Sequence, residues 1–238
     1  MRLMKRILSA AAVLALSASL LVGCSSGTAS SVPVSASSAA ESTVSSVEET
    51  ASSAVDENEA AAAQLLNDLT GSYQELWPVI LADEYKQTWL DDCTALVGED
   101  NAEAAFEKLS SMVTGDVYGE DAVKAYANGG GAYFCGFTNS LAILTFDGET
   151  STISGTDKDG NVLFSHAYHY IGMEPVRGLY EFESDDADSG EFTYFFLAPD
   201  TSAETYHIEF RYGSDAEALS QYDAGEYAYW VASGISTD

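Results

Sequence analysis

Two residues in the segment Thr205–Asp215, TYHIEFRYGSD, have side chains that could bind a metal ion. The segment alternates in hydropathy as a β-strand does, so His207 and Glu209 fall on one face and apolar side chains on the other. An imidazole nitrogen and a carboxylate oxygen on one face are ligands that zinc accepts. We therefore predict a candidate metal site at His207 and Glu209.

Two ligands do not complete a metal site. Asp200 and Glu204, in the loop before this strand, are candidates for a third ligand because they are near in the sequence. The alternative interpretation is a polar strand face, on which His207 and Glu209 form a hydrogen-bonded pair with Arg211 as a further partner. The sequence leaves both interpretations open.

The remaining candidate residues favour structural roles. His166 and His169, the other two histidines, point in opposite directions along a predicted strand, so we expect structural or surface positions for both. The segment Asp157–Asn161, DKDGN, has strand-like flanks, which favours a hairpin turn over a calcium-binding loop. No Gly-x-Ser-x-Gly elbow, phosphate-binding loop or positioned nucleophile–base pair occurs, so we expect the protein not to be an enzyme.

The N-terminus has the pattern of an exported protein. A basic start precedes an apolar stretch over residues 7–21 that is short for a membrane span. It ends in LVGC, which resembles the lipobox of bacterial lipoproteins. The resemblance implies a signal peptide over residues 1–23, lipidation of Cys24, and attachment to the extracytoplasmic face of the cell membrane through this lipid only.

The composition then changes twice. Residues 24–62 are rich in Ser, Ala and Glu and contain no aromatic side chain, which predicts a disordered tether whose end, from about Asp56, begins a helix. Residues 63–238 hold the aromatic side chains and have the size of one domain.

The formal net charge of −29 excludes nucleic acid and anionic lipid surfaces as electrostatic partners. Cys93 and Cys135 form either a disulfide or two buried thiols; the sequence leaves this open.

The domain divides into a helical part and a strand part. Apolar residues recur at helical spacing in the ranges 61–69, 71–82, 84–98 and 100–113, and a shorter helix is expected over 119–128. From Gly131 the period changes to two, in the segments AYFCGF, LAILTF, STISG, NVLFSHAYHYIG, RGLYEFE, EFTYFFLA, TYHIEFRYG and EYAYWVA. We predict an α+β domain with an N-terminal helical subdomain followed by an antiparallel barrel.

Several of these segments resemble the ZinT family of exported zinc-binding proteins, which includes the C-terminal domain of AdcA-type zinc-transport lipoproteins. The similar segments are DLTGSYQELWPVI (Asp68–Ile80), AYHYIG (Ala167–Gly172), VRGLYEFE (Val176–Glu183) and HIEFRYGSDAEAL (His207–Leu219), in the family's order. The resemblance implies that the barrel is calycin-like, that is, lipocalin-like.

The resemblance also implies a metal centre and shows how this chain departs from it. The family binds its metal through the two histidines of a His-x-His strand and one upstream histidine. Here His207 matches the first, Glu209 replaces the second, and Ala198 stands at the upstream position. The expected function is an extracytoplasmic, lipid-anchored protein that binds a divalent metal ion, zinc, with an altered ligand set and passes it to an unidentified metal-transport partner. The alternative is a metal-free calycin-like module that binds a small molecule or a protein.

Overall fold

The computed structural model describes residues 57–115, 117–127, 133–199 and 205–238. The predicted signal peptide, Cys24, the tether up to residue 56, Asp200 and Glu204 lie outside these residues. Within the described ranges, no helix has the length and apolar character needed to cross a membrane.

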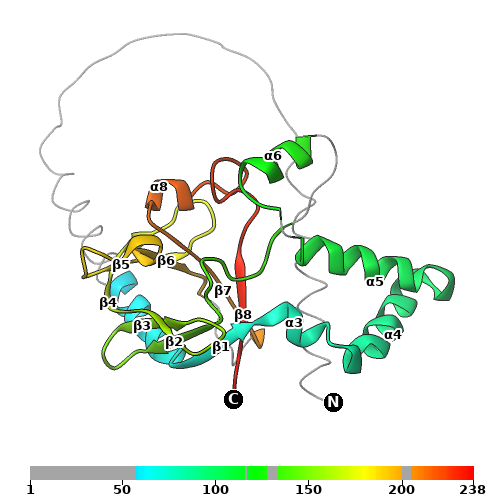
Figure 1. The fold of residues 1–238 in the computed structure, drawn as a ribbon, viewed down its shortest axis with the longest axis horizontal. Helices are drawn as coiled ribbons and strands as arrows, with labels where there is room; N and C mark the ends of the chain where they lie inside the picture. Colours follow the sequence, from blue (N-terminus) through cyan, green and yellow to red (C-terminus); the bar gives the residue numbers. More distant parts are fainter. Residues whose placement is uncertain (1–56, 116, 128–132, 200–204) are drawn as a thin grey trace, which may run out of the picture. The chain divides into compact units, whose positions relative to one another are not determined.

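A closed antiparallel barrel forms the centre of the domain (Figure 1). In the described residues its eight strands pair in sequence order, and β8 closes the ring by pairing with β1. This is the up-and-down arrangement of lipocalin-like barrels, and it confirms the predicted fold class. The strands are β1 (Gly71–Glu75), β2 (Ile143–Asp147), β3 (Thr152–Thr156), β4 (Val162–Met173), β5 (Tyr180–Ser184), β6 (Tyr194–Leu197), β7 (Ile208–Gly213) and β8 (Ala232–Ser236).

Helices precede and interrupt the barrel sequence. Residues 57–68 are helical; the predicted start near Asp56 lies at the edge of the described residues. The others are α3 (Leu76–Ile80), η1 (Asp83–Tyr85), α4 (Lys86–Val97), α5 (Glu99–Val113), α6 (Glu120–Ala127), η2 (Gly190–Phe192) and α8 (Ala216–Leu219). Helices α4 and α5 pack as a hairpin in which Trp89 contacts Phe106 at 6.2 Å between ring centroids.

The helix predicted over residues 71–82 is partly wrong. Its first five residues form the strand that closes the barrel. Gly71–Glu75 forms strand β1, and only the residues from Leu76 onward are helical. Tyr73 is 3% exposed because it points into the barrel, while β1 pairs with both β2 and β8. Pairing with two distant strands outweighs the local helical spacing. Helices α3 to α6 therefore lie between β1 and β2 in sequence, rather than before the whole barrel.

Two strands predicted from the sequence, AYFCGF and EYAYWVA, also differ from the observed strands. The described part of the segment AYFCGF, residues 133–137, forms no strand, and there only Phe134 makes isolated bridges, to Thr114 and Trp230. The last strand is not EYAYWVA but Ala232–Ser236, which begins at the last residue of that segment. Tyr229, inside the segment, has a φ of 58°, a left-handed conformation that interrupts an extended strand.

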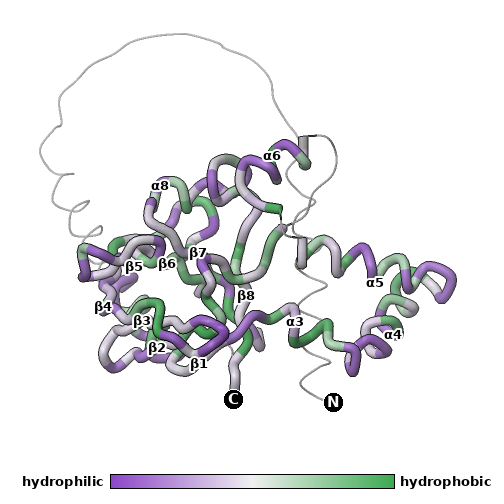
Figure 2. Tube along the Cα trace, in the orientation of Figure 1, coloured by the Kyte–Doolittle hydropathy of each residue, from purple (hydrophilic) through white to green (hydrophobic). Residues whose placement is uncertain are grey.

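Aromatic side chains fill the barrel. Most of the strands contribute apolar side chains to the buried core. Hydrophobic and hydrophilic stretches are interspersed along the trace of the barrel (Figure 2). Phe195 and Tyr212 are fully buried and lie 5.4 Å apart, and Tyr212 meets Trp230 edge to face at 5.0 Å. This dense packing gives the strands a rigid base from which outward-facing side chains project.

Candidate metal centre

His207 and Glu209 lie on the outer face of the barrel wall, at the start of β7. Ile208, Phe210 and Tyr212 point into the core, so the alternation predicted for this strand is confirmed from His207 onward. Tyr206, by contrast, has a φ of 67° and stands outside the strand. The chain therefore turns sharply just before the first candidate ligand.

The two side chains face each other. His207 Nε2 lies 3.5 Å from Glu209 Oε1. His207 Nδ1 lies 2.9 Å from the backbone carbonyl oxygen of Thr205. Because a carbonyl oxygen only accepts, Nδ1 carries the proton, and in the neutral ring the lone pair is on Nε2, toward the carboxylate.

The neighbourhood of the pair is largely buried. His207 is 8% exposed, and the Glu209 side chain is 21% exposed. The Thr205 hydroxyl donates to the carbonyl oxygen of His207 at 2.7 Å, so Thr205 and His207 hold each other in place. A rigid imidazole that presents a lone pair beside a carboxylate is a ligand arrangement for a divalent cation.

Arg211 is not a member of this pair. The polar-face interpretation gave it that role, but its guanidinium donates to the carbonyl oxygens of Leu219 and Tyr227. It also stacks on Tyr222, with Cζ 4.4 Å from the ring centroid. Glu209 therefore has no cationic partner in Arg211, and its charge is directed toward His207.

The sequence did not indicate that Cys135 belongs to this neighbourhood. The Cys135 carbonyl accepts from the amide of Ser233, the residue that pairs with Glu209 across β7 and β8. Burial, and secondly the negative charge of Glu209, raise the pKa of Cys135 to about 12. The thiol stays protonated and is not presented as a thiolate ligand.

The cysteines resolve one alternative left open by the sequence. Cys93 and Cys135 are both free thiols in the structure. Cys93 is buried on α4, and burial, followed by the charge of Asp92, raises the pKa of its thiol. The alternative of two thiols is confirmed, but the predicted burial holds for Cys93 only, because Cys135 is half-buried.

A third protein ligand is not found in the described part of the chain. No group of three or more His, Cys, Asp or Glu side chains there is arranged to hold a metal ion. Asp200 and Glu204, the predicted candidates, lie outside the described residues. The structure thus brings together His207 and Glu209 and leaves the remaining coordination positions unassigned.

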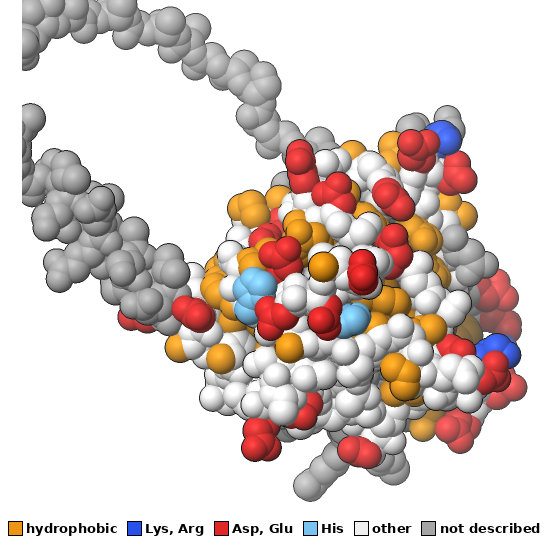
Figure 3. Space-filling model, turned by 60° about the vertical axis from the view of Figure 1, so that its left-hand side comes forward, with side chains coloured by type: hydrophobic (Ala, Val, Ile, Leu, Met, Phe, Trp, Pro, Cys, Tyr) orange, Lys and Arg blue, Asp and Glu red, His pale blue; other side chains and the backbone are white. Residues whose placement is uncertain are grey.

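The other residues weighed from the sequence have structural partners. His166 Nδ1 lies 2.6 Å from Asp186, and His169 Nδ1 lies 2.7 Å from Asp185. On the face drawn in Figure 3, histidine side chains lie beside Asp and Glu side chains. The Asp157 carboxylate accepts from the amides of Asp159 and Asn161 at 2.9 Å each, which confirms a hairpin turn.

Comparison with known proteins gives similarities of fold. No family model matches the sequence, and no curated protein matches it. The Zn(II)-bound ZinT-like domain of Streptococcus pneumoniae AdcA is similar, with a TM-score of 0.45 and 16% identity over 73% of this chain and 83% of that one. Zn(II)-bound AdcA from Streptococcus pneumoniae has a TM-score of 0.41 and 15% identity over 73% of this chain. The match spans 32% of that longer protein.

Proposed function

We propose that this chain is a lipid-anchored extracytoplasmic protein that binds a divalent metal ion, zinc, through His207 and Glu209, and that it is a binding protein rather than an enzyme. The observation that carries the proposal is the orientation of His207. Its Nδ1 donates to the Thr205 carbonyl, and its Nε2 lies 3.5 Å from Glu209 Oε1.

The spacing of these two atoms fits zinc. With zinc–ligand bonds of about 2.0–2.2 Å, two ligand atoms of a tetrahedral site lie about 3.3–3.6 Å apart. The observed 3.5 Å falls within this range, so the two side chains need little rearrangement to share an ion. The Thr205 carbonyl acts as the outer partner that fixes the tautomer and the ring orientation of the histidine.

Each residue then has a distinct role. His207 supplies a nitrogen donor, and Glu209 supplies an oxygen donor with a negative charge that offsets part of the charge of the ion. A donor set in which a carboxylate oxygen replaces an imidazole nitrogen is harder, so discrimination between zinc and manganese should be weaker than in a three-histidine site. Because protonation of the imidazole competes with the metal, binding should also weaken in acid.

Calorimetric titration of zinc into the purified protein tests this site. We expect the tightest zinc-binding event to be abolished by His207→Ala and weakened by Glu209→Gln. His166→Ala is the matched control, because it removes an imidazole that is hydrogen-bonded to Asp186 elsewhere on the barrel. If the wild type and His207→Ala bind zinc equally, the candidate site is only a polar strand face, and the metal-free binding module becomes the better hypothesis.

The lipid anchor is supported by the LVGC segment and needs its own test. We expect the wild type to fractionate with membranes and Cys24→Ala to be released or left unprocessed. A Cys24→Ala protein that is processed and retained on the membrane like the wild type would exclude lipidation at this residue.

The proposal also includes a metal-transport protein that accepts the ion. Pull-down with zinc-loaded and with zinc-free protein tests for such a partner.

A further inference from the structure

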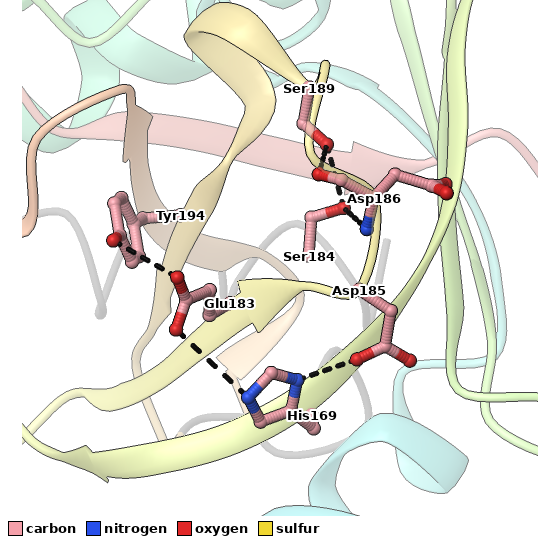
Figure 4. Close-up of polar contacts among 7 residues, drawn as sticks. All are labelled: His169, Glu183, Ser184, Asp185, Asp186, Ser189 and Tyr194. Carbon is pink, nitrogen blue, oxygen red and sulfur yellow. Dashed lines mark hydrogen bonds and ion pairs between the residues drawn. The ribbon is translucent and has the colours of Figure 1, made fainter.

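A second histidine faces a glutamate elsewhere on the outer face of the barrel. His169 on β4 pairs directly with Glu183 on β5, and Glu183 pairs directly with Tyr194 on β6. The three side chains therefore form a row across neighbouring antiparallel strands (Figure 4). Directly opposed residues in such strands have Cβ atoms about 4.5–5.5 Å apart, so their side chains can act together.

The orientation of the His169 ring follows from Asp185. His169 Nδ1 lies 2.7 Å from Asp185 Oδ1. Because an ionised carboxylate only accepts, Nδ1 donates, and the lone pair of the neutral ring is on Nε2. Nε2 is directed toward Glu183, whose Oε2 lies 4.0 Å away (Figure 4). Two acceptors thus face each other across a gap that is too wide for a hydrogen bond.

Glu183 is oriented as well. The Tyr194 hydroxyl donates to Glu183 Oε1 at 3.1 Å, which leaves Oε2 on the side of His169. Each of the two facing atoms therefore belongs to a group that another residue holds in place. Metal-binding histidines and carboxylates have this kind of outer hydrogen bond, and loss of such a bond weakens metal affinity by about 10- to 100-fold.

We propose that His169 and Glu183 are the two protein ligands of a second divalent-cation site, with Asp185 and Tyr194 as positioning residues and water in the remaining coordination positions. The 4.0 Å gap is about 0.5 Å wider than the ligand spacing of tetrahedral zinc, and both side chains are exposed enough to rotate by that amount. The His169 and Glu183 side chains are 53% and 37% exposed. Such a site binds more weakly than a closed one and exchanges its ion readily with solvent.

This site is independent of the one at His207. The two sites have the same arrangement: an oxygen acceptor orients Nδ1 of the histidine, and a glutamate oxygen lies opposite Nε2. The distance from Nε2 to that oxygen is 3.5 Å at His207 and 4.0 Å at His169. They differ in exposure, since the His207 side chain is 11% exposed. A surface site of this kind would load zinc, manganese or cobalt from solution without involving the buried one.

The chain contains a matched control in His166. Its Nδ1 also bonds to an aspartate, Asp186, at 2.6 Å. Its ring lies 5.9 Å from Phe164 and 6.5 Å from Tyr168, and among the described residues no carboxylate is paired with its Nε2. His166 therefore reproduces the histidine–aspartate pair without the facing glutamate.

Nitrogen-15 NMR of the histidine rings in the full protein tests the proposal, because the chain has only three histidines. Zinc chloride is titrated at neutral pH into the wild type and into His207→Ala, in which the first candidate site is absent. We expect the Nε2 resonance of His169 to shift with zinc in both proteins, and that of His166 to stay in place. Glu183→Gln should remove the shift, and Asp185→Asn should raise the zinc concentration that it requires by about 10-fold or more.

Three results would overturn the site. They are a His169 resonance unaffected by millimolar zinc, an equal response of His166 and His169, and a response that Glu183→Gln leaves unchanged. The first means that no cation binds between His169 and Glu183, and the other two indicate general attraction of cations to an acidic surface. Loss of the His169 response only in His207→Ala would tie both effects to one site and also contradict the proposal. Failure of zinc binding at His207 leaves the expectation for His169 intact.

Discussion

Replacing Arg211 by methionine should destabilise the protein strongly, although Arg211 lies outside both candidate sites. Its side chain is fully buried on the outer side of β7. The guanidinium donates to the carbonyl oxygens of Leu219 and Tyr227, and more weakly to Gln221 at 3.4 Å. These carbonyls belong to the last residue of α8 and to the segment that links α8 to β8, so Arg211 holds both against the barrel wall.

The magnitude follows from the bonds that are lost. Burial lowers the pKa of Arg211 to about 10, but the side chain remains charged at neutral pH. Hydrogen bonds of a charged donor contribute about 1.5–3 kcal/mol each, and methionine leaves two close carbonyl acceptors unsatisfied. Removing a buried cation recovers some desolvation free energy, and Nε makes no hydrogen bond within the described residues. We therefore expect a loss of about 2–5 kcal/mol in the free energy of unfolding.

Arg177→Met is the matched control. The Arg177 guanidinium lies 4.3 Å from the same Tyr222 ring, but it is exposed and has a hydrogen bond to the Tyr133 hydroxyl at 3.0 Å. An exposed cation–π contact contributes about 0.5–1 kcal/mol, so the control should lose no more than that.

Urea unfolding followed by circular dichroism and tryptophan fluorescence measures both variants, since Trp230 packs against Tyr227. For a domain of this size, the expected loss for Arg211→Met lowers the melting temperature by about 5–20 °C. A loss below about 1 kcal/mol, or one equal to that of Arg177→Met, would refute the assignment of Arg211 as the residue that fastens this segment.

Three further predictions concern ionisation, reactivity and strain. Burial raises the pKa of Tyr222 to about 12, so the stability from keeping this phenol neutral is complete below about pH 10 and is lost as pH rises toward 12. Unfolding by urea at increasing pH should show this fall, and Tyr222→Phe should reduce it. Because Cys135 also has its pKa raised to about 12, native protein should react with a thiol reagent at neutral pH much more slowly than unfolded protein; equal rates would contradict the burial. Gly119 has a φ of +69°, and an added Cβ would lie 2.5 Å from the Glu226 carbonyl oxygen. Gly119→Ala should therefore cost about 1–3 kcal/mol, more than Gly98→Ala, which has a φ of +84° but nothing within 4 Å; equal losses would show that the contact is relieved.

Local sequence predicted the strands that have one face on the core. In β2 the residues Leu144 and Phe146 are buried and their neighbours are more exposed, so a period of two is visible without any knowledge of the partner strands. The same reasoning found the hairpin turn at Asp157 and the outward direction of His207 and Glu209. In each case the signal lies within a few adjacent residues.

Strand β1 and the true position of β8 were not predictable in this way. The segment Gly71–Glu75 continues into a helix, and its apolar spacing suits a helix as well as a strand. It becomes a strand because it pairs with β2 and β8, which are far away in the sequence. Apart from Ile235, Ala232–Ser236 has small side chains with little strand preference, and it too is defined by its two partner strands, β1 and β7.

The sequence by itself determined which residues could be ligands, and tertiary structure decided which of them face one another. The His-x-Glu spacing places His207 and Glu209 on one face of any strand, because side-chain direction repeats every two residues. The pairing of His169 with Glu183 depends instead on the register between β4 and β5. A shift of one residue in that register would turn Glu183 away from His169, and register depends on the burial of the whole barrel rather than on either strand alone.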